Sequence, residues 1–160
     1  MAQLGSLPFF AIALSSMISG LVSDRLIVRG WDTSRVRKFF ISTGLFMGCL
    51  VLPAALVENR VLCVVLIVIA SLCYGMCSSN IWAITQTLAG PAASGKWTGL
   101  QNAFGNMAGW VAPYLTGWIV KETHSYVLAF VATAVAASIG GLSFLFVIQK
   151  VEPIVWRKRS

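Results

Sequence analysis

Long apolar runs separated by short polar segments dominate the pattern of this chain. About 20 mostly apolar residues in helical form cross a bilayer core, and five runs reach that length. They cover about residues 3–22, 39–57, 61–85, 97–120 and 126–148. None of them contains Asp, Glu, Lys, Arg or His, and none alternates as a transmembrane strand would. Because backbone groups in lipid must be hydrogen-bonded within the protein, each run predicts a membrane-spanning helix.

Composition supports the same class of protein. Hydrophobic residues make up 58% of the chain and charged residues only 11%, whereas a soluble domain carries roughly 25% charged residues. A water-soluble fold of this size has no place for so much apolar surface. We therefore expect an all-α, multi-pass integral membrane protein with the lipid bilayer as its surroundings.

The basic residues indicate which ends of the helices share one side of the membrane. The predicted loop 23–38, the connection 86–96 and the tail 149–160 hold all but two of the twelve Lys and Arg residues. The positive-inside rule places these three segments, and so the C-terminus, in the cytoplasm. The net charge of +7 is thus a topology signal, and no nucleic-acid partner is expected. In a bacterium the membrane would be the plasma (inner) membrane.

The first polar segment carries a candidate motif. Gly20 would let a second helix approach closely, and Asp24 can cap a helix or pair with an arginine. Arg25 and Arg29 follow at the membrane face. An ordinary turn with inside-positive charges explains these residues equally well from the pattern alone.

Polar side chains inside two apolar runs are the candidates for a binding site. Polar residues are costly in a membrane and usually face a cavity or a neighbouring helix. Asn102 and Asn106 lie four residues apart and share one helix face. We interpret Asn102 as facing a cavity and Asn106 as bonding to another helix, and Pro113 predicts a kink in the same run.

The run 61–85 contains a tryptophan among polar groups. Ser79 and Trp82 are three residues apart, on one face of a helix. Trp82 beside hydroxyl and amide groups suits a pocket for a hydroxylated solute. A packed tryptophan with locally bonded serines is the structural alternative.

No set of residues indicates catalysis, a cofactor or a metal. There is no Ser/His/Asp set, no pair of carboxylates within an apolar run and no phosphate-binding loop. The only histidine, His124, lies between two runs, and all four cysteines lie inside runs, where helix packing explains them. We expect no enzymatic activity.

Two segments resemble a known family. The wording Gly20…Ser23-Asp24-Arg25…Arg29-Gly30…Arg37-Lys38 is similar to the loop motif of the major facilitator superfamily, and in particular to its anion:cation symporter branch. The segment from Gly95 to Gly117, with Gln101, Asn102 and Pro113, is similar to helix eleven of that branch. The chain thus resembles helices eight to twelve of a twelve-helix transporter, a partial C-terminal half of the fold.

This resemblance implies a function, a site and partners. Such transporters bind substrate between two six-helix halves and work by alternating access. The branch takes up organic anions, among them sugar acids such as hexuronates and hexonates, with a cation that would be a proton. The missing N-terminal half would be a partner of this chain. The implied substrate contacts are Ser79, Trp82 and Asn102, with Gln101 and Asn80 weaker, and the implied conformational-gating motif is Gly20, Asp24, Arg25 and Arg29.

A second hypothesis remains beside the transporter. The chain is then a truncated or independent five-helix membrane protein with a structural or assembly role. The abrupt apolar start favours part of a longer transporter. In either case we expect no coupled transport by this chain alone, because its apolar runs contain no cation for a carboxylate and no ionisable group for a proton.

Overall fold

The computed structural model describes residues 2–156, with side chains from residue 5 onward. Those residues form helices and connections, without strands. The helices are α1 (Ala2–Val28), α2 (Thr33–Gly48), α3 (Val51–Leu56), α4 (Arg60–Thr123) and α5 (Tyr126–Phe146). Four helical stretches are long and apolar enough to cross a membrane, the short α3 being counted with α2. The expected all-α membrane fold is confirmed.

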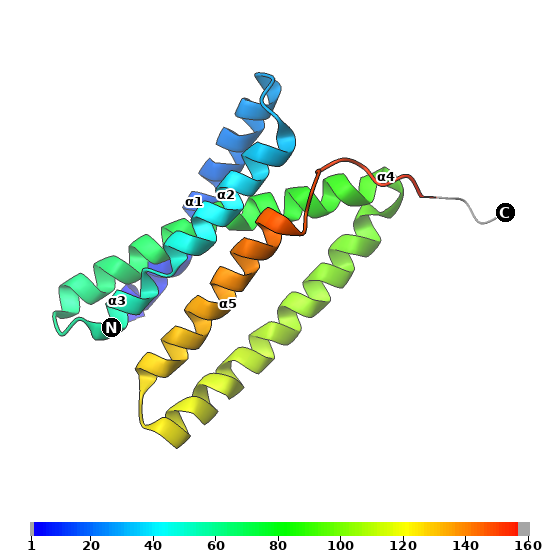
Figure 1. Cartoon of the computed structure of the whole chain (residues 1–160). Coiled ribbons are helices and arrows are strands. Elements are labelled where there is room, and N and C mark those ends of the chain that lie inside the picture. The colour runs from blue at the N-terminus through cyan, green and yellow to red at the C-terminus, as the bar shows by residue number, and fades with distance from the viewer. Residues whose placement is uncertain (1, 157–160) are drawn as a thin grey trace.

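Helix α4 contains a sharp break at Gly90 (Figure 1). Gly90 has φ 64° and ψ 175°, a left-handed backbone that favours glycine. Pro91 follows and has no N–H with which to continue the helix. We call residues 60–89 the first arm and residues 91–123 the second arm. They correspond to the third and fourth predicted helices, so the count of about five spans agrees with four continuous stretches.

The predicted polar segment 23–38 is mostly helical, which corrects the expectation of a long loop. Helix α1 continues to Val28, and α2 begins at Thr33. Asp32 caps α2 by accepting a hydrogen bond from the Arg35 N–H at 2.8 Å. The backbone of α1 thus stays helical beyond its first charged residues, Asp24 and Arg25.

Two further predicted boundaries differ from the structure. The run 39–57 is interrupted after Gly48, where two residues separate α2 from α3. The connection 86–96 is helical except at Gly90. Hydropathy does not detect such changes because the flanking residues are apolar or neutral on both sides of each.

The first arm of α4 is the centre of the packing. Serines of α1 donate to its backbone, from Ser15 Oγ to Leu72 O at 2.5 Å and from Ser19 Oγ to Met76 O at 3.1 Å. Helix α2 lies as close, because a Cβ built on Gly44 would stand 2.5 Å from Cys73 O. Small residues therefore bring three helices together, as expected in a membrane bundle.

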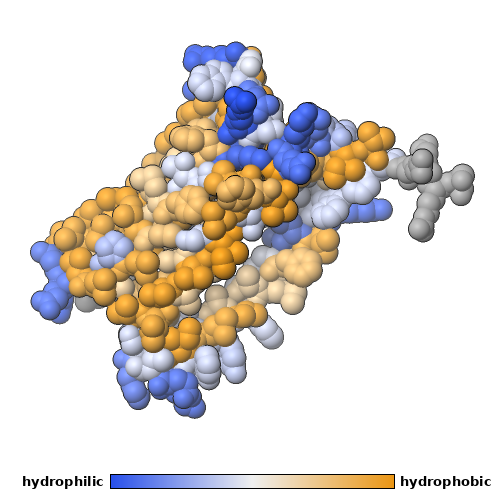
Figure 2. Space-filling model, viewed as in Figure 1, coloured by the Kyte–Doolittle hydropathy of each residue, from blue (hydrophilic) through white to orange (hydrophobic). Residues whose placement is uncertain are grey.

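On the face that Figure 2 shows, polar side chains gather at the ends of the helices, and apolar ones cover their flanks. The α1–α2 turn, the α4 break and the C-terminal segment meet at one end. The Val151 N–H bonds Ser34 Oγ, and the Ile154 N–H bonds Leu88 O, both at 2.9 Å. The three segments predicted to share one side of the membrane are therefore neighbours.

Candidate functional site

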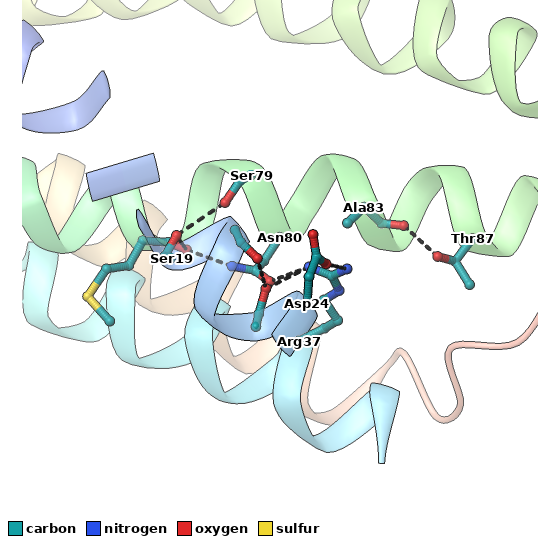
Figure 3. A network of polar contacts seen from close by, with 10 residues as sticks. Ser19, Asp24, Arg37, Ser79, Asn80, Ala83 and Thr87 are labelled. Carbon is teal, nitrogen blue, oxygen red and sulfur yellow. Dashed lines mark hydrogen bonds and ion pairs between the residues drawn. The ribbon is translucent and has the colours of Figure 1, made fainter. Parts of the chain in front are cut away.

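A cluster of polar side chains around Arg37 joins three helices at this end of the bundle (Figure 3). Arg37 Nη1 donates to Ser23 Oγ at 2.8 Å and to Asn80 Oδ1 at 2.9 Å. Its Nη2 donates to Asp24 Oδ1 at 2.6 Å, which is also an ion pair. Ser23 and Asp24 belong to α1, Arg37 to α2 and Asn80 to α4. We call these four residues the Arg37 cluster.

Burial differs strongly within the Arg37 cluster. The Arg37 side chain is 12% exposed, whereas that of Asp24 is 61% exposed. Ser23 and Asn80 are fully buried. A largely desolvated guanidinium needs acceptors, and a neutral buried amide supplies one without a further charge to bury. Asn80 and Ser23 therefore stabilise Arg37 from inside, while water weakens the contribution of Asp24.

Asn80 uses both ends of its side-chain amide within the protein. Its Oδ1 accepts from Arg37, and its Nδ2 donates to Met76 O at 3.0 Å. The sequence suggested Asn80 as a weaker substrate contact. In this conformation its amide is engaged and buried, so it holds Arg37 and does not face an open space.

Next to this cluster, α1 and α4 approach closely. Ser19 Oγ and Ser79 Oγ are 3.2 Å apart. A Cβ built on Gly20 would lie 3.4 Å from Ser79 Oγ, at the near limit of ordinary van der Waals contact. Gly20 therefore lies where α1 and α4 approach each other, and its motif role stays a prediction.

The remaining motif residues differ in their surroundings. Asp24 pairs with an arginine, one of the two roles that the pattern allowed, and its partner is Arg37. Arg25 and Arg29 are exposed near the end of α1. The motif thus divides into a packed part and a solvated part.

An open hollow of about 550 Å³ lies at the break of α4. Polar residues from both arms line it, among them Gln86 on the first arm and Thr98 on the second. Trp82 precedes Gln86 by four residues and Asn102 follows Thr98 by four, so each shares a helix face with a lining residue. The predicted substrate residues therefore continue from the hollow along both arms.

The two arms differ in how they hold these residues. Ser79 and Trp82 are half-buried against the bundle, whereas Asn102 is exposed. No hydrogen bond joins Ser79 or Trp82 to Gln101 or Asn102 within the described part of the chain. The structure brings the candidates onto the faces of one bent helix, but it does not close them into a single pocket.

On the second arm, one asparagine orients the other. Asn106 Nδ2 donates to Asn102 O at 2.8 Å and to Asn102 Oδ1 at 3.2 Å. These bonds lie within one helix. The prediction was that Asn106 bonds to another helix, and the structure does not show such a bond among the described residues. Gln101 keeps its Oε1 buried, and no hydrogen-bond partner for that atom occurs among residues 5–156.

Sequence reasoning missed Arg37 as a functional residue. It counted this arginine only among the basic residues of the motif. The available signal was a set of three serines, Ser15, Ser19 and Ser23. They repeat every four residues and so form a polar stripe along one face of their own helix. Among the described residues, no group of three or more His, Cys, Asp or Glu side chains could hold a metal ion.

Comparison with known proteins gives a match along the whole chain. The sequence profile of the Major Facilitator Superfamily matches residues 1–160. The probable galactarate/D-glucarate transporter GudP of Bacillus subtilis is 29% identical over 157 residues, which cover 97% of this chain and 34% of that protein. The probable L-galactonate transporter of Escherichia coli is 25% identical over 150 residues, covering 92% and 33%.

A carrier that is named for a different substrate is also similar. The voltage-gated purine nucleotide uniporter SLC17A9 of Rattus norvegicus is 30% identical over 143 residues, covering 86% of this chain and 31% of that protein. The chain thus spans about one third of the length of these relatives. All three are named as transporters or uniporters, in agreement with the expectation that the chain is not an enzyme.

Proposed function

Because the chain belongs to the Major Facilitator Superfamily, as its loop motif predicted, we propose that it works as part of a longer transporter for organic anions. The substrate class is a sugar acid, such as a hexuronate or hexonate, or a related carboxylate. The observation that carries this proposal is the similarity along nearly the whole chain to transporters named for galactarate, glucarate and galactonate. The chain is a multi-pass integral membrane protein, whether or not it is part of a transporter.

Charge determines what the rest of the transporter must supply. A carboxylate substrate needs a cationic partner in the membrane. The apolar runs of this chain contain no basic residue, and Arg37 is occupied by Ser23, Asp24 and Asn80. The substrate-binding cation and the proton-carrying group therefore belong to the missing N-terminal half. This chain supplies hydroxyl, amide and aromatic contacts from Ser79, Trp82 and Asn102.

Proton-coupled symport with alternating access is the proposed mode. The Arg37 cluster ties α1, α2 and the first arm of α4 together at one end of the bundle, so its making and breaking would bias that end between closed and open states. The gating motif Gly20, Asp24, Arg25 and Arg29 would act there, at the cytoplasmic side. Because one relative is named a uniporter, the coupling to a proton has to be measured directly.

Substitutions in the complete transporter test the site. Trp82→Ala and Asn102→Ala should each raise the KM for uptake of labelled galactarate or galactonate by about 5- to 30-fold, because a lost hydrogen bond or apolar wall is worth about 1–2 kcal/mol. Trp31→Ala is the matched control, since Trp31 is 63% exposed in the α1–α2 turn, away from both arms of α4. If both site variants kept the uptake rate and KM of the unchanged protein, the site assignment would be wrong.

The alternative is an independent membrane protein with a structural or assembly role. Reading the coding sequence upstream of Met1 separates the two hypotheses. An in-frame extension that encodes about seven further apolar helices would complete a twelve-helix fold and support transport. An in-frame stop directly upstream would overturn transport by this gene product and favour an assembly role.

A further inference from the structure

The segment after α5 crosses the end of the bundle and reaches the break of α4 (Figure 1). Residues 147–156 form this C-terminal strap, which is extended from Ile148 onward. None of its residues is among the proposed substrate contacts or the gating motif. Its contacts nevertheless involve α2 and both arms of α4, so it touches every element that meets at this end of the bundle except α1.

The first half of the strap is firmly attached. Val151 is 4% exposed and belongs to the same apolar cluster as Ile41 and Ile84. Its N–H donates to Ser34 Oγ. Lys38 Nζ donates to Gln149 O at 3.0 Å, so a side chain of α2 also holds this stretch. We call residues 147–151 the anchor.

The second half of the strap meets the break itself. The last carbonyls of a helix have no partner within the helix and need one elsewhere. The Ile154 N–H donates to Leu88 O at 2.9 Å, and Trp156 Nε1 donates to Ala89 O at 2.7 Å. Two carbonyls at the end of the first arm are thus capped by the far end of the chain.

The same half also touches the beginning of the second arm. The Trp156 and Trp97 rings lie 6.3 Å apart between centroids, with their planes 33° from parallel. A Cβ built on Gly90 would lie 3.8 Å from Pro153 Cβ. Residues 152–156 therefore contact both arms and the glycine between them.

These contacts are few and solvent-exposed. Ile154 is 50% exposed and Trp156 is 43% exposed, in contrast to the buried Val151. Exposed segments with few apolar contacts open at low free-energy cost. The strap thus combines a fixed half with a half that can detach.

We propose that residues 152–156 are a releasable latch that fixes the angle between the two arms of α4. With the latch docked, the capped carbonyls and the Trp97–Trp156 contact hold the second arm in place. With the latch released, the second arm pivots at Gly90 while the anchor stays bound. The latch is independent of the proposed transport function, because its test requires no substrate.

Hydrogen exchange of the whole chain in lipid nanodiscs tests the latch directly. Trp97→Ala removes the ring contact but leaves both hydrogen-bond donors. Exchange at the Ile154 amide and the Trp156 indole should accelerate roughly 5- to 10-fold, the effect of losing one modest contact from a local opening equilibrium. The Val151 amide should keep its rate. Val155→Ala is the control, since Val155 is 94% exposed.

Two outcomes would overturn the proposal. Equal acceleration at Val151 and Ile154 would mean that the strap opens as one piece. Unchanged exchange at Ile154 in Trp97→Ala would mean that the Trp97–Trp156 contact does not keep residues 152–156 docked.

A distance measurement tests the pivot separately. Leu62 on the first arm and Leu115 on the second are both exposed. Replacing each with a spin-labelled noncanonical residue gives a distance that reports the angle between the arms. Trp156→Phe keeps a ring opposite Trp97 but loses the donor to Ala89 O, and Trp156→Ala loses both. The distance distribution should be broadest in Trp156→Ala, narrower in Trp156→Phe and narrowest in the unchanged protein. A distribution identical in all three would contradict the pivot.

Discussion

Arg37 shows how one side chain can organise the end of a membrane bundle. Its guanidinium reaches α1 through Ser23 and Asp24, and α4 through Asn80. Its Nε is buried, and no hydrogen-bond partner for it occurs in the described part of the chain. A cation held with one donor unsatisfied depends strongly on the acceptors that it has.

Removing the buried acceptor should destabilise the protein. Asn80→Leu keeps a side chain of similar size but leaves Arg37 Nη1 with Ser23 alone, so the free energy of unfolding should fall by about 1–3 kcal/mol. Denaturant titration in detergent micelles measures this loss, with Ser78→Ala as the control on the same helix. Equal stability of Asn80→Leu and the control would refute the role of Asn80.

Removing the exposed acceptor should matter less. Asp24 is charged, but its side chain is 61% exposed, and exposed ion pairs contribute about 0–1 kcal/mol. Asp24→Asn should therefore reduce the free energy of unfolding by less than Asn80→Leu does in the same titration. The reverse order would show that the ion pair, and not the buried amide, stabilises Arg37.

The sequence identified the motif but not the geometry of its cluster. Asp24 and Arg37 are thirteen residues apart, across a turn whose length hydropathy overestimated. Once α1 extends to Val28 and α2 begins at Thr33, the two residues lie opposite each other on neighbouring helices. Asn80 lies on a third helix, so only tertiary structure could assign its partner.

At the scale of elements, close contacts between helices depend on a few small residues. Gly44 and Gly48 lie one turn apart near the end of α2. A Cβ on Gly44 would clash with Cys73 O at 2.5 Å, whereas nothing lies within 4 Å of a Cβ on Gly48. The two glycines are therefore a matched pair for testing the α2–α4 contact.

Alanine at the two positions should have opposite consequences. Gly44→Ala forces the backbones of α2 and α4 apart and should cost about 1–3 kcal/mol, as overpacking of a core does. Gly48→Ala meets open space and should be neutral or slightly stabilising, because alanine favours helix over glycine. Thermal unfolding in micelles compares them. Equal melting temperatures would mean that α2 can shift without cost.

The break of α4 also shows what local rules can and cannot predict. Pro113 predicted a kink, and the backbone is helical through Pro113, whereas the break lies at Gly90. Glycine followed by proline removes both a Cβ and a donor at one place, while Pro113 is preceded by helix-compatible residues. The strap that covers the break was not predictable, because residues 147–156 have no periodic pattern.

At the scale of the whole molecule, the predicted topology places three basic segments on one side. The structure brings the α1–α2 turn, the α4 break and the C-terminal strap together. If the positive-inside rule holds, that side is the cytoplasm. A fluorescent protein fused after Ser160 should fluoresce, and alkaline phosphatase at the same point should be inactive. Active phosphatase there would reverse the orientation.

The second arm of α4 is the least covered part of the molecule. Trp110 is 86% exposed and Tyr114 is 75% exposed. A Cβ on Gly105 or Gly109 would meet nothing within 4 Å, although this spacing of small residues is typical of close helix contacts. If the proposed longer transporter exists, its remaining helices would pack along this arm.

This difference in context gives a prediction for the complete molecule. Gly105→Val should leave the free energy of unfolding of this chain nearly unchanged, within about 0.5–1 kcal/mol, because it adds volume to open space and valine fits a helix no worse than glycine does. In the complete transporter the same change should lower uptake or unfolding temperature, since a neighbouring helix would meet the added methyl groups. Gly75→Val is the positive control, because a Cβ there would stand 2.6 Å from Ile12 O in the chain itself. If Gly105→Val were silent in both contexts, this face of the second arm would lie against lipid, and the binding face would have to be sought elsewhere on α4.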